Sequence, residues 1–237
     1  MKKVRAVLFD LDGTLLPMDL DKFLKEYLTS LAAKAASRGY DPKRFSRALL
    51  LGIEASLAND GEDTNENVFW RVFLGEYSEE SFDISMFDEY YRDDFPRLSA
   101  TCGYTPEAKA AVGKMKELGF RVALATNPVY PEVATNQRIA WAGLSPQDFE
   151  LVTTYECYKS SKPNLSYYLD VAARMGLAPE ECLVVGNDTS DDMVAESLGM
   201  KVFLLTDCLI NKSGEDISRY PNGGFAELIS YAAELLK

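Results

Sequence analysis

The sequence predicts an α/β protein: a parallel sheet flanked by helices, with an all-helical segment inserted after the first strand. Short apolar runs alternate with amphipathic stretches from about residue 100 onward, as in repeated β–α units. A further apolar run, rich in β-branched side chains, stands near the N-terminus at residues 4–9. Residues 17–99, between these two regions, show only helical periodicity.

The first predicted strand ends at two carboxylates, Asp10 and Asp12. Side chains two residues apart lie on the same face of an extended chain, and Gly13 then allows a sharp turn. Two carboxylates on one face repel each other unless a cation lies between them. The pattern therefore predicts a metal at the carboxyl end of this strand, where open α/β sheets place their chemistry.

The inserted segment reads as a bundle of helices. An apolar stripe from Leu20 to Leu31 predicts a helix that ends near Gly39, and residues 44–57 and 67–73 predict two more. We expect residues 1–16 and 100–237 to form the sheet domain and residues 17–99 to form a helical cap. Five aromatic residues are expected in the core of that cap rather than on a surface for the substrate: Phe69, Trp70, Phe73, Tyr90 and Tyr91.

The remaining elements follow in β–α order. Thr105 is expected to cap a helix that has Pro106 in its first turn and stops at Gly119. Strands are predicted at residues 120–125, 149–153, 182–185 and 201–205. Helices are predicted at residues 134–142, after Pro163, at 192–198 and from about 225 to the end.

Composition excludes several classes of function. The 237 residues carry a net charge of −12, which argues against a nucleic-acid partner, whose phosphates need a basic surface. The chain has no histidine, which removes serine–histidine hydrolases and histidine-ligated zinc. The four cysteines form no C-x-x-C pair and are expected to be reduced, and no segment is long enough to span a membrane. We expect a cytoplasmic protein whose oligomeric state the sequence does not fix.

Polar groups follow four of the predicted strands, and the carboxyl ends of parallel strands meet at one edge of a sheet. Asp10 and Asp12 follow the first strand, Thr126 and Asn127 another, and Lys162 opens a helix after a third. Residues 186–192, which include the aspartates at 188, 191 and 192, follow the fourth. Each group alone suits an ordinary turn, helix cap or surface position. Together they supply a carboxylate nucleophile, a second carboxylate, a hydroxyl and an ammonium group, which suits phosphoryl transfer.

These segments resemble the four motifs of the haloacid dehalogenase-like hydrolase superfamily, in its phosphatase branch with a helical cap. The matching segments are VLFDLDGTLL, ALATN, SKPN and VVGNDTSDDM, in that order along the chain. The resemblance implies a Rossmann-like core and a Mg²⁺-dependent phosphatase that hydrolyses a small phosphorylated metabolite through an aspartyl phosphate.

The resemblance also implies a role for each residue. Asp10 would be the nucleophile, and Asp12 the general acid and then the base, with its backbone carbonyl on the metal. Thr126 and Asn127 would bind the phosphoryl oxygens, and Lys162 would neutralise the phosphoryl charge. For Asp12 to hold a proton at neutral pH, its pKa must be raised.

The fourth motif allows two alignments. One places Asn187 with Asp192 on the metal, and the other places Asp188 with Asp192 there, with Asp191 beside them. We prefer the second alignment, because a carboxylate binds Mg²⁺ better than an amide does. The predicted metal ligands are therefore Asp10, Asp12, Asp188 and Asp192.

Two alternatives stay open at this level. A phosphosugar mutase would use the same two aspartates but return the phosphoryl group to its substrate. A non-catalytic binding protein could also keep this scaffold, because a fold does not fix a function.

Overall fold

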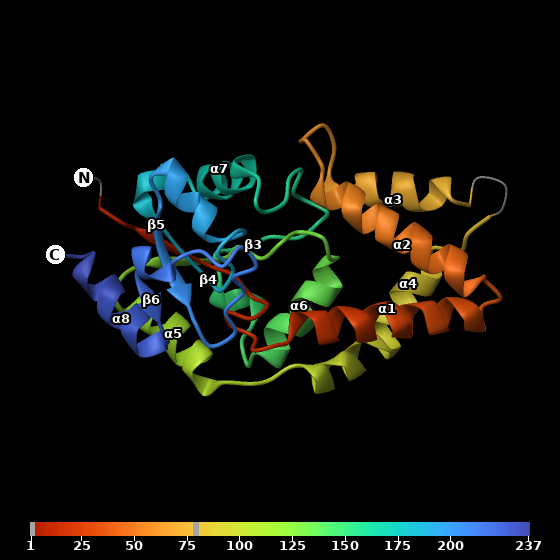
Figure 1. Ribbon diagram of the computed structural model, residues 1–237, viewed down its shortest axis with the longest axis horizontal. Coiled ribbons are helices and arrows are strands. Elements are labelled where there is room, and N and C mark those ends of the chain that lie inside the picture. The colour runs from red at the N-terminus through yellow and green to blue at the C-terminus, as the bar shows by residue number, and fades with distance from the viewer. Residues whose placement is uncertain (1–2, 78–80) are drawn as a thin grey trace.

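The computed structural model describes residues 3–77 and 81–237 (Figure 1). Residues 1–2 and 78–80, which the sequence analysis assigned to the sheet domain and to the cap, lie outside the described residues. Six strands form one parallel sheet in the order β3-β2-β1-β4-β5-β6, which confirms the predicted fold class. The strands are β1 (Ala6–Phe9), β2 (Arg121–Leu124), β3 (Leu151–Val152), β4 (Cys182–Gly186), β5 (Lys201–Leu205) and β6 (Asn222–Gly223).

The central strand β1 sets the position of the functional edge. Its four residues are fully buried, as expected for a strand covered on both faces. Phe9 pairs in register with Leu124 of β2 and with Val185 of β4. The three central strands therefore end at one level, so the residues that follow them meet at one edge of the sheet.

Helices cover both faces of the sheet. Val7 and Phe9 pack in one hydrophobic cluster with α5 (Pro106–Glu117), α6 (Glu132–Trp141) and α8 (Phe225–Glu234). Ala6 and Leu8 pack in a second cluster with α7 (Leu165–Arg174). The alternation of β1 side chains between the two clusters is the period-2 pattern of a strand between two helical layers (Figure 1).

The described residues of the segment after β1 form four α-helices at one end of the molecule (Figure 1). These are α1 (Leu20–Ser37), α2 (Pro42–Leu57), α3 (Asn65–Gly75) and α4 (Ser85–Asp93), followed by a 3₁₀ helix, Phe95–Thr101. The side chains of Asp19, Asp41 and Thr64 cap the first three by accepting backbone N–H groups. The buried side chains of this helical segment are continuous with the cluster that contains Phe9, so the predicted domain boundaries remain a prediction.

Some elements differ from the sequence-based expectations. The short helix predicted at residues 192–198 is a 3₁₀ helix, Met193–Leu198, and the Asp192 side chain makes no capping hydrogen bond to it. Strand β6 has only two residues, Asn222 and Gly223, and gives no periodic signal. The helix α4 and the 3₁₀ helix after it were not predicted as helices. All four cysteines are free, and among the described residues no helix is long and apolar enough to cross a membrane.

Candidate active site

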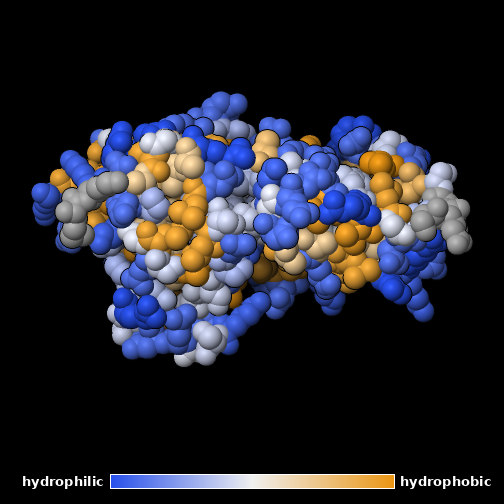
Figure 2. Space-filling view, turned by 90° about the horizontal axis from the view of Figure 1, so that it is seen from above, coloured by the Kyte–Doolittle hydropathy of each residue, from blue (hydrophilic) through white to orange (hydrophobic). Residues whose placement is uncertain are grey.

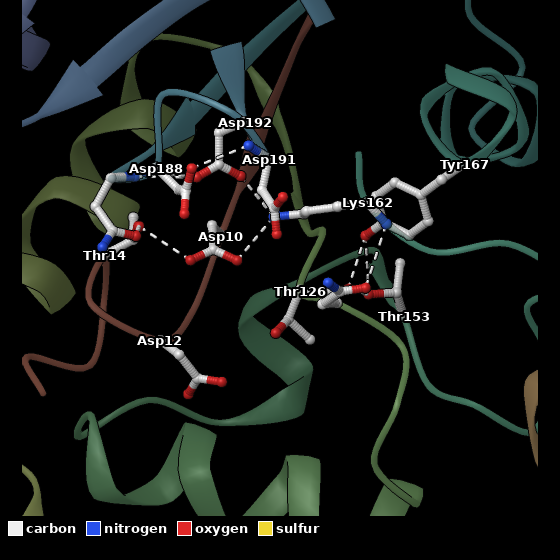
Figure 3. A network of polar contacts seen from close by, with 12 residues as sticks. Asp10, Asp12, Thr14, Thr126, Thr153, Lys162, Tyr167, Asp188, Asp191 and Asp192 are labelled. Carbon is white, nitrogen blue, oxygen red and sulfur yellow. Dashed lines mark hydrogen bonds and ion pairs between the residues drawn. The ribbon is translucent and has the colours of Figure 1, made fainter. Parts of the chain in front are cut away.

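The Asp10 carboxylate lies at the end of β1 and is 8% exposed. Its Oδ1 accepts a hydrogen bond from Lys162 Nζ at 2.8 Å, and Thr14 Oγ1 lies 3.1 Å from its Oδ2. Burial raises the pKa of Asp10 to about 7 although Lys162 opposes the rise, and the carboxylates of Asp192 and Asp12 add to it. Figure 3 shows Asp10 between Thr14 and Lys162. The carboxylate is thus held by the Lys162 ammonium group and contacted by the Thr14 hydroxyl, whose single proton either Asp10 or Asn187 can accept.

The turn after β1 requires a glycine. Gly13 has φ +82°, a left-handed conformation that other residues adopt only at a cost. A Cβ at this position would lie 2.3 Å from Asn187 Nδ2, so the backbone approaches the loop after β4 more closely than any side chain allows. The amide of Asn187 is itself held: its Oδ1 lies 3.0 Å from Thr14 Oγ1, and its Nδ2 donates to the Cys208 carbonyl at 2.7 Å.

Lys162 joins two of the acidic groups. Its ammonium donates to Asp10 and also to Asp192 Oδ1 at 2.6 Å, and the residue is 4% exposed. Burial alone would lower the pKa of Lys162, but Asp10 and Asp192 outweigh that effect and hold the pKa well above its usual value. Two carboxylates thus hold the Lys162 ammonium group beside the functional end of β1.

Asp192 has a structural task in this loop. Its Oδ2 accepts the backbone N–H groups of Asn187 and Asp188, both at 3.1 Å, while its Oδ1 accepts Lys162. Gly186 makes room for this carboxylate, since a Cβ there would lie 2.1 Å from Asp192 Cγ. Both oxygens of Asp192 thus bind protein groups, and the role of Asp192 as a metal ligand stays a prediction.

Two other acidic residues of the loop are more open. Asp188 accepts the backbone N–H groups of Ser190 at 2.7 Å and Asp191 at 3.0 Å, both through Oδ1. The carboxylate of Asp191 accepts no hydrogen bond from the described residues. Burial raises the pKa of Asp191 to about 6, and the neighbouring Asp188 and Asp192 add to the rise. Figure 3 shows these carboxylates beside Asp10.

Asp12 is paired with a buried arginine that the sequence analysis did not single out. Arg138 of α6 is 0% exposed, and its Nη1 donates to Asp12 Oδ2. The guanidinium lies over the Tyr130 ring, 4.2 Å from its centroid, while Asp12 Oδ1 and Arg138 Nε have no partner within the described residues. Burial raises the pKa of Asp12, and Arg138 and Lys162 oppose that rise. The direction suits a carboxyl group that must carry a proton.

Arg138 left a signal in the sequence. It occupies the middle of an i, i+4, i+8 series with Ala134 and Ala142, and all three residues are buried. An arginine inside an apolar stripe of a helix needs an acidic partner, because an unpaired buried charge is very costly. A buried arginine at this position therefore predicts a carboxylate that faces α6, without identifying Asp12 as that carboxylate.

Hydrogen bonds from residues outside the cavity hold the loop that follows β2. The Thr126 carbonyl accepts hydrogen bonds from Thr153 Oγ1 at 2.6 Å and from Tyr167 Oη at 2.8 Å. Asn127 Oδ1 accepts the backbone N–H of Lys162 at 3.2 Å. Thr126 is 2% exposed, and both Thr126 and Asn127 line the same cavity as Asp10. The supporting residues Thr153 and Tyr167 were not predicted, because Thr153 ends a predicted strand and Tyr167 lies in a predicted helix, where nothing distinguishes them from structural residues.

A cavity of about 320 Å³ lies between the sheet edge and the inserted helices. All the residues that the sequence analysis assigned to the site line it, and so does Asn187: Asp10, Asp12, Thr126, Asn127, Lys162, Asp188 and Asp192. The structure therefore brings the predicted groups together. Of the five aromatic residues expected in the core of the insertion, Phe73 and Tyr90 are wholly buried, while Phe69, Trp70 and Tyr91 also line the cavity.

The donor groups are of the kind that Mg²⁺ prefers. Mg²⁺ binds one or two carboxylates and keeps several waters or substrate oxygens, so it needs no dense cluster of side chains. In the described part of the chain no group of three or more His, Cys, Asp or Glu residues is arranged to hold a metal. Asp10, Asp188 and Asp191 line one cavity, and Asp12 Oδ1 is buried there without a partner, so hard oxygen donors surround the space.

Comparison with known proteins identifies the family of this chain. The profile of the haloacid dehalogenase-like hydrolases matches residues 4–199. YhcW of Bacillus subtilis (strain 168) is 28% identical over 114 residues, which are 48% of this chain and 50% of YhcW, so this alignment spans about half the relative's length. Phosphoglycolate phosphatase of Aquifex aeolicus (strain VF5) is 25% identical over 201 residues, covering 85% of this chain and 84% of that protein.

The fold is also that of solved structures. The crystal structure of 2-haloacid dehalogenase from Pseudomonas syringae pv. Tomato DC3000 superposes with a TM-score of 0.65, covering 98% of this chain and 99% of the other. At 18% sequence identity this likeness concerns the fold alone.

Proposed function

The chain belongs to the haloacid dehalogenase-like hydrolase family, and we propose that it is a phosphoric monoester hydrolase that acts on a small phosphorylated metabolite through a phosphorylated Asp10. One observation carries this proposal above the others. The Asp10 carboxylate lies at the carboxyl end of the central strand, 2.8 Å from a buried ammonium group, and faces a cavity that Asp12 also lines. A carboxylate so fixed is suited to attack an electrophile that binds in that cavity.

In the first step an Asp10 oxygen attacks the phosphorus atom of the substrate. The bond from Asp10 to phosphorus forms, the bond from phosphorus to the ester oxygen breaks, and Asp12 gives its proton to the departing alcohol oxygen. The raised pKa of Asp12, which burial causes, keeps that proton available.

In the second step water attacks the phosphorus atom of phosphorylated Asp10. Asp12, now a carboxylate, accepts a proton from that water, and the bond between Asp10 and phosphorus breaks. Inorganic phosphate leaves, and both aspartates return to their starting states. Arg138 contacts Asp12 throughout and stabilises its ionised form between the two steps.

Three other residues position the phosphoryl group. Lys162 supplies positive charge beside Asp10, and Thr126 and Asn127 offer a hydroxyl and an amide at the same wall of the cavity. The hydrogen bonds from Thr153 and Tyr167 to the Thr126 carbonyl fix this wall before substrate arrives, so little reorganisation is needed during the reaction.

We assign the metal to the acidic side of the cavity. Asp10, the backbone carbonyl of Asp12 and Asp188 would hold Mg²⁺, with Asp191 beside them. When bound, Mg²⁺ would offset the negative charge of the phosphoryl group. Asp192, which the sequence analysis also placed on the metal, instead holds Lys162 and the loop backbone in this proposal.

The helical segment, residues 17–99, acts as the cap over this site in our proposal. It supplies the wall of the cavity that faces the sheet edge, which would exclude bulk water and contact the leaving group. A cavity of about 320 Å³ suits a small metabolite rather than a phosphoprotein or a nucleic acid. A cytoplasmic location agrees with the four free cysteines.

The test is phosphate release from a panel of phosphorylated metabolites, measured with Mg²⁺ and with EDTA. We expect release that requires Mg²⁺ and that falls by about a thousandfold or more in Asp10→Asn. The matched control is Asp207→Asn, which changes an exposed aspartate that follows β5 and does not line the cavity. Full activity in Asp10→Asn would overturn the proposed mechanism. Transfer of phosphate within a sugar phosphate, without release, would instead identify a mutase.

A further inference from the structure

The two ends of the cavity differ in chemistry. The polar residues assigned above to phosphoryl transfer and metal binding lie at the sheet edge. The wall formed by the inserted helices is hydrocarbon and aromatic, with Leu24, Ile53, Phe69, Trp70 and Phe87 among its side chains. The site therefore offers a polar end for a phosphoryl group and an apolar end for whatever the phosphoryl group is attached to.

The charge at the apolar end of the cavity is negative. Among the described residues of α1 to α4 that line the cavity, Asp88 is the only charged one, and none is a lysine or an arginine. The remaining polar side chains there are largely occupied, as in the pair formed by the hydroxyls of Tyr27 and Tyr91 at 2.8 Å. A leaving group with a carboxylate or a second phosphate would meet Asp88 and no cation.

The cavity mouth is also apolar. Six large hydrophobic side chains in the described part of the chain are exposed, and three of them, Leu57, Ile84 and Val133, line this cavity. Their exposed fractions are 40%, 43% and 45%. Figure 2 shows hydrophobic residues on both halves of this face, including the half that carries α2 and α3. Exposed apolar side chains gathered around a cavity mark a ligand surface more often than scattered ones do.

We propose that the substrate is a phosphate monoester of an uncharged, largely hydrocarbon alcohol, such as one that carries an aromatic ring. This inference rests on the proposed phosphatase function and deepens it. The phosphoryl group lies among Asp10, Lys162 and Thr126, and the hydrocarbon part contacts the aromatic wall. Short polar esters such as phosphoglycolate bury a carboxylate against that wall and gain no apolar contact.

The experiment compares three substrates on the Mg²⁺-loaded protein. Acetyl phosphate is an activated acyl phosphate that carries neither a hydrocarbon ring nor a further carboxylate, so its Asp10-dependent hydrolysis reports the phosphatase function without a contribution from the leaving group's fit. Benzyl phosphate and phosphoglycolate then report the preference for the leaving group. We expect kcat/KM for benzyl phosphate to exceed that for phosphoglycolate by about a hundredfold or more.

Two variants of the same helix sharpen the test. Leu57 and Leu50 both lie on α2 and are 40% and 43% exposed, but only Leu57 lines the cavity. Leu57→Lys places a cation at the mouth and should lower the ratio of benzyl phosphate to phosphoglycolate activity by about tenfold. Leu50→Lys should leave that ratio unchanged.

The possible outcomes distinguish a wrong substrate class from a wrong phosphatase function. Hydrolysis of acetyl phosphate with equal or better use of phosphoglycolate would overturn the substrate class and leave the phosphatase function intact. An equal response of the ratio to Leu57→Lys and Leu50→Lys would also overturn the substrate class. If none of the three compounds is hydrolysed, the proposed function is overturned and the inference with it.

Discussion

The glycine of the first motif offers a quantitative test of how the site is built. Gly13 has φ +82°, and a Cβ at this position would lie 2.3 Å from Asn187 Nδ2. Gly39, which follows the end of α1, has a similar φ of +87° but has no heavy atom within 4 Å of the same added Cβ. The two glycines therefore differ in the space around them and hardly at all in backbone conformation.

The expected free energies follow from this difference. Gly39→Ala adds only the cost of a left-handed conformation, about 1–2 kcal/mol of unfolding free energy. Gly13→Ala adds the same cost and also an overlap that must displace Asn187, which contributes about 1–3 kcal/mol more. We expect Gly13→Ala to destabilise the protein by about 2–5 kcal/mol in total and to lower activity, because Asn187 contacts the Thr14 hydroxyl beside Asp10.

Urea unfolding of the metal-free protein measures both variants. In a protein that already carries Asn187→Ala, adding Gly13→Ala creates no such overlap. The further loss in unfolding free energy should then be only the cost of the left-handed backbone conformation. If Gly13→Ala and Gly39→Ala destabilise the protein equally, the close approach between the first and fourth motifs has no energetic consequence, and this reasoning fails.

Two further predictions concern the buried charges. Arg138→Met should lower the free energy of unfolding by about 3 kcal/mol, because Asp12 loses the fully buried guanidinium that also packs over the Tyr130 ring. Arg121→Met breaks a more exposed pair and should cost less than about 1 kcal/mol, so equal costs in urea unfolding would contradict this role of Arg138. Asp192→Asn should lower the free energy of unfolding of the metal-free protein by about 3 kcal/mol, because Asp192 pairs with Lys162 and accepts backbone N–H groups. Asp188→Asn should lower the free energy of unfolding by less than about 1 kcal/mol. It should nevertheless weaken Mg²⁺ binding, measured by calorimetry, about tenfold or more. If only Asp192→Asn weakens Mg²⁺ binding, the metal ligand is Asp192, as the sequence alignment suggested.

Much of the fold was predictable because polar residues, glycines and prolines mark where most helices and strands begin and end. The strands around β1 are short apolar runs that end at polar groups, and β5 spans the residues 201–205 predicted for it. The short element β6 was missed because Asn222 and Gly223 carry no strand signal and pair only through β5. Its existence depends on tertiary contacts that sequence periodicity does not report.

The candidate site was predictable to the extent that strand order fixes positions. Parallel pairing of β1 with β2 and β4 brings Asp10, Thr126 and the loop after β4 to one edge, and the motifs marked these segments. The register within the acidic loop could not be read, because three carboxylates at 188, 191 and 192 look alike in sequence. Only their hydrogen bonds distinguish Asp192, which holds Lys162, from Asp188.

The apolar wall of the cavity shows a further limit of sequence reasoning. Phe69, Trp70 and Tyr91 were expected to be core, and they do pack against other rings. They line the cavity as well, because the helices that carry them lie opposite the sheet edge. A periodic apolar stripe looks the same whether one side of it contacts protein or faces a substrate.

The most direct test of the central claim is to trap the phosphorylated enzyme. Rapid quenching during turnover of benzyl phosphate or acetyl phosphate, followed by borohydride reduction, converts an aspartyl phosphate into homoserine, which peptide mass spectrometry can locate. The mechanism predicts homoserine at position 10, dependent on substrate and Mg²⁺. Phosphate release at full rate with homoserine at another position, or with none at all, would contradict the role of Asp10 as the nucleophile.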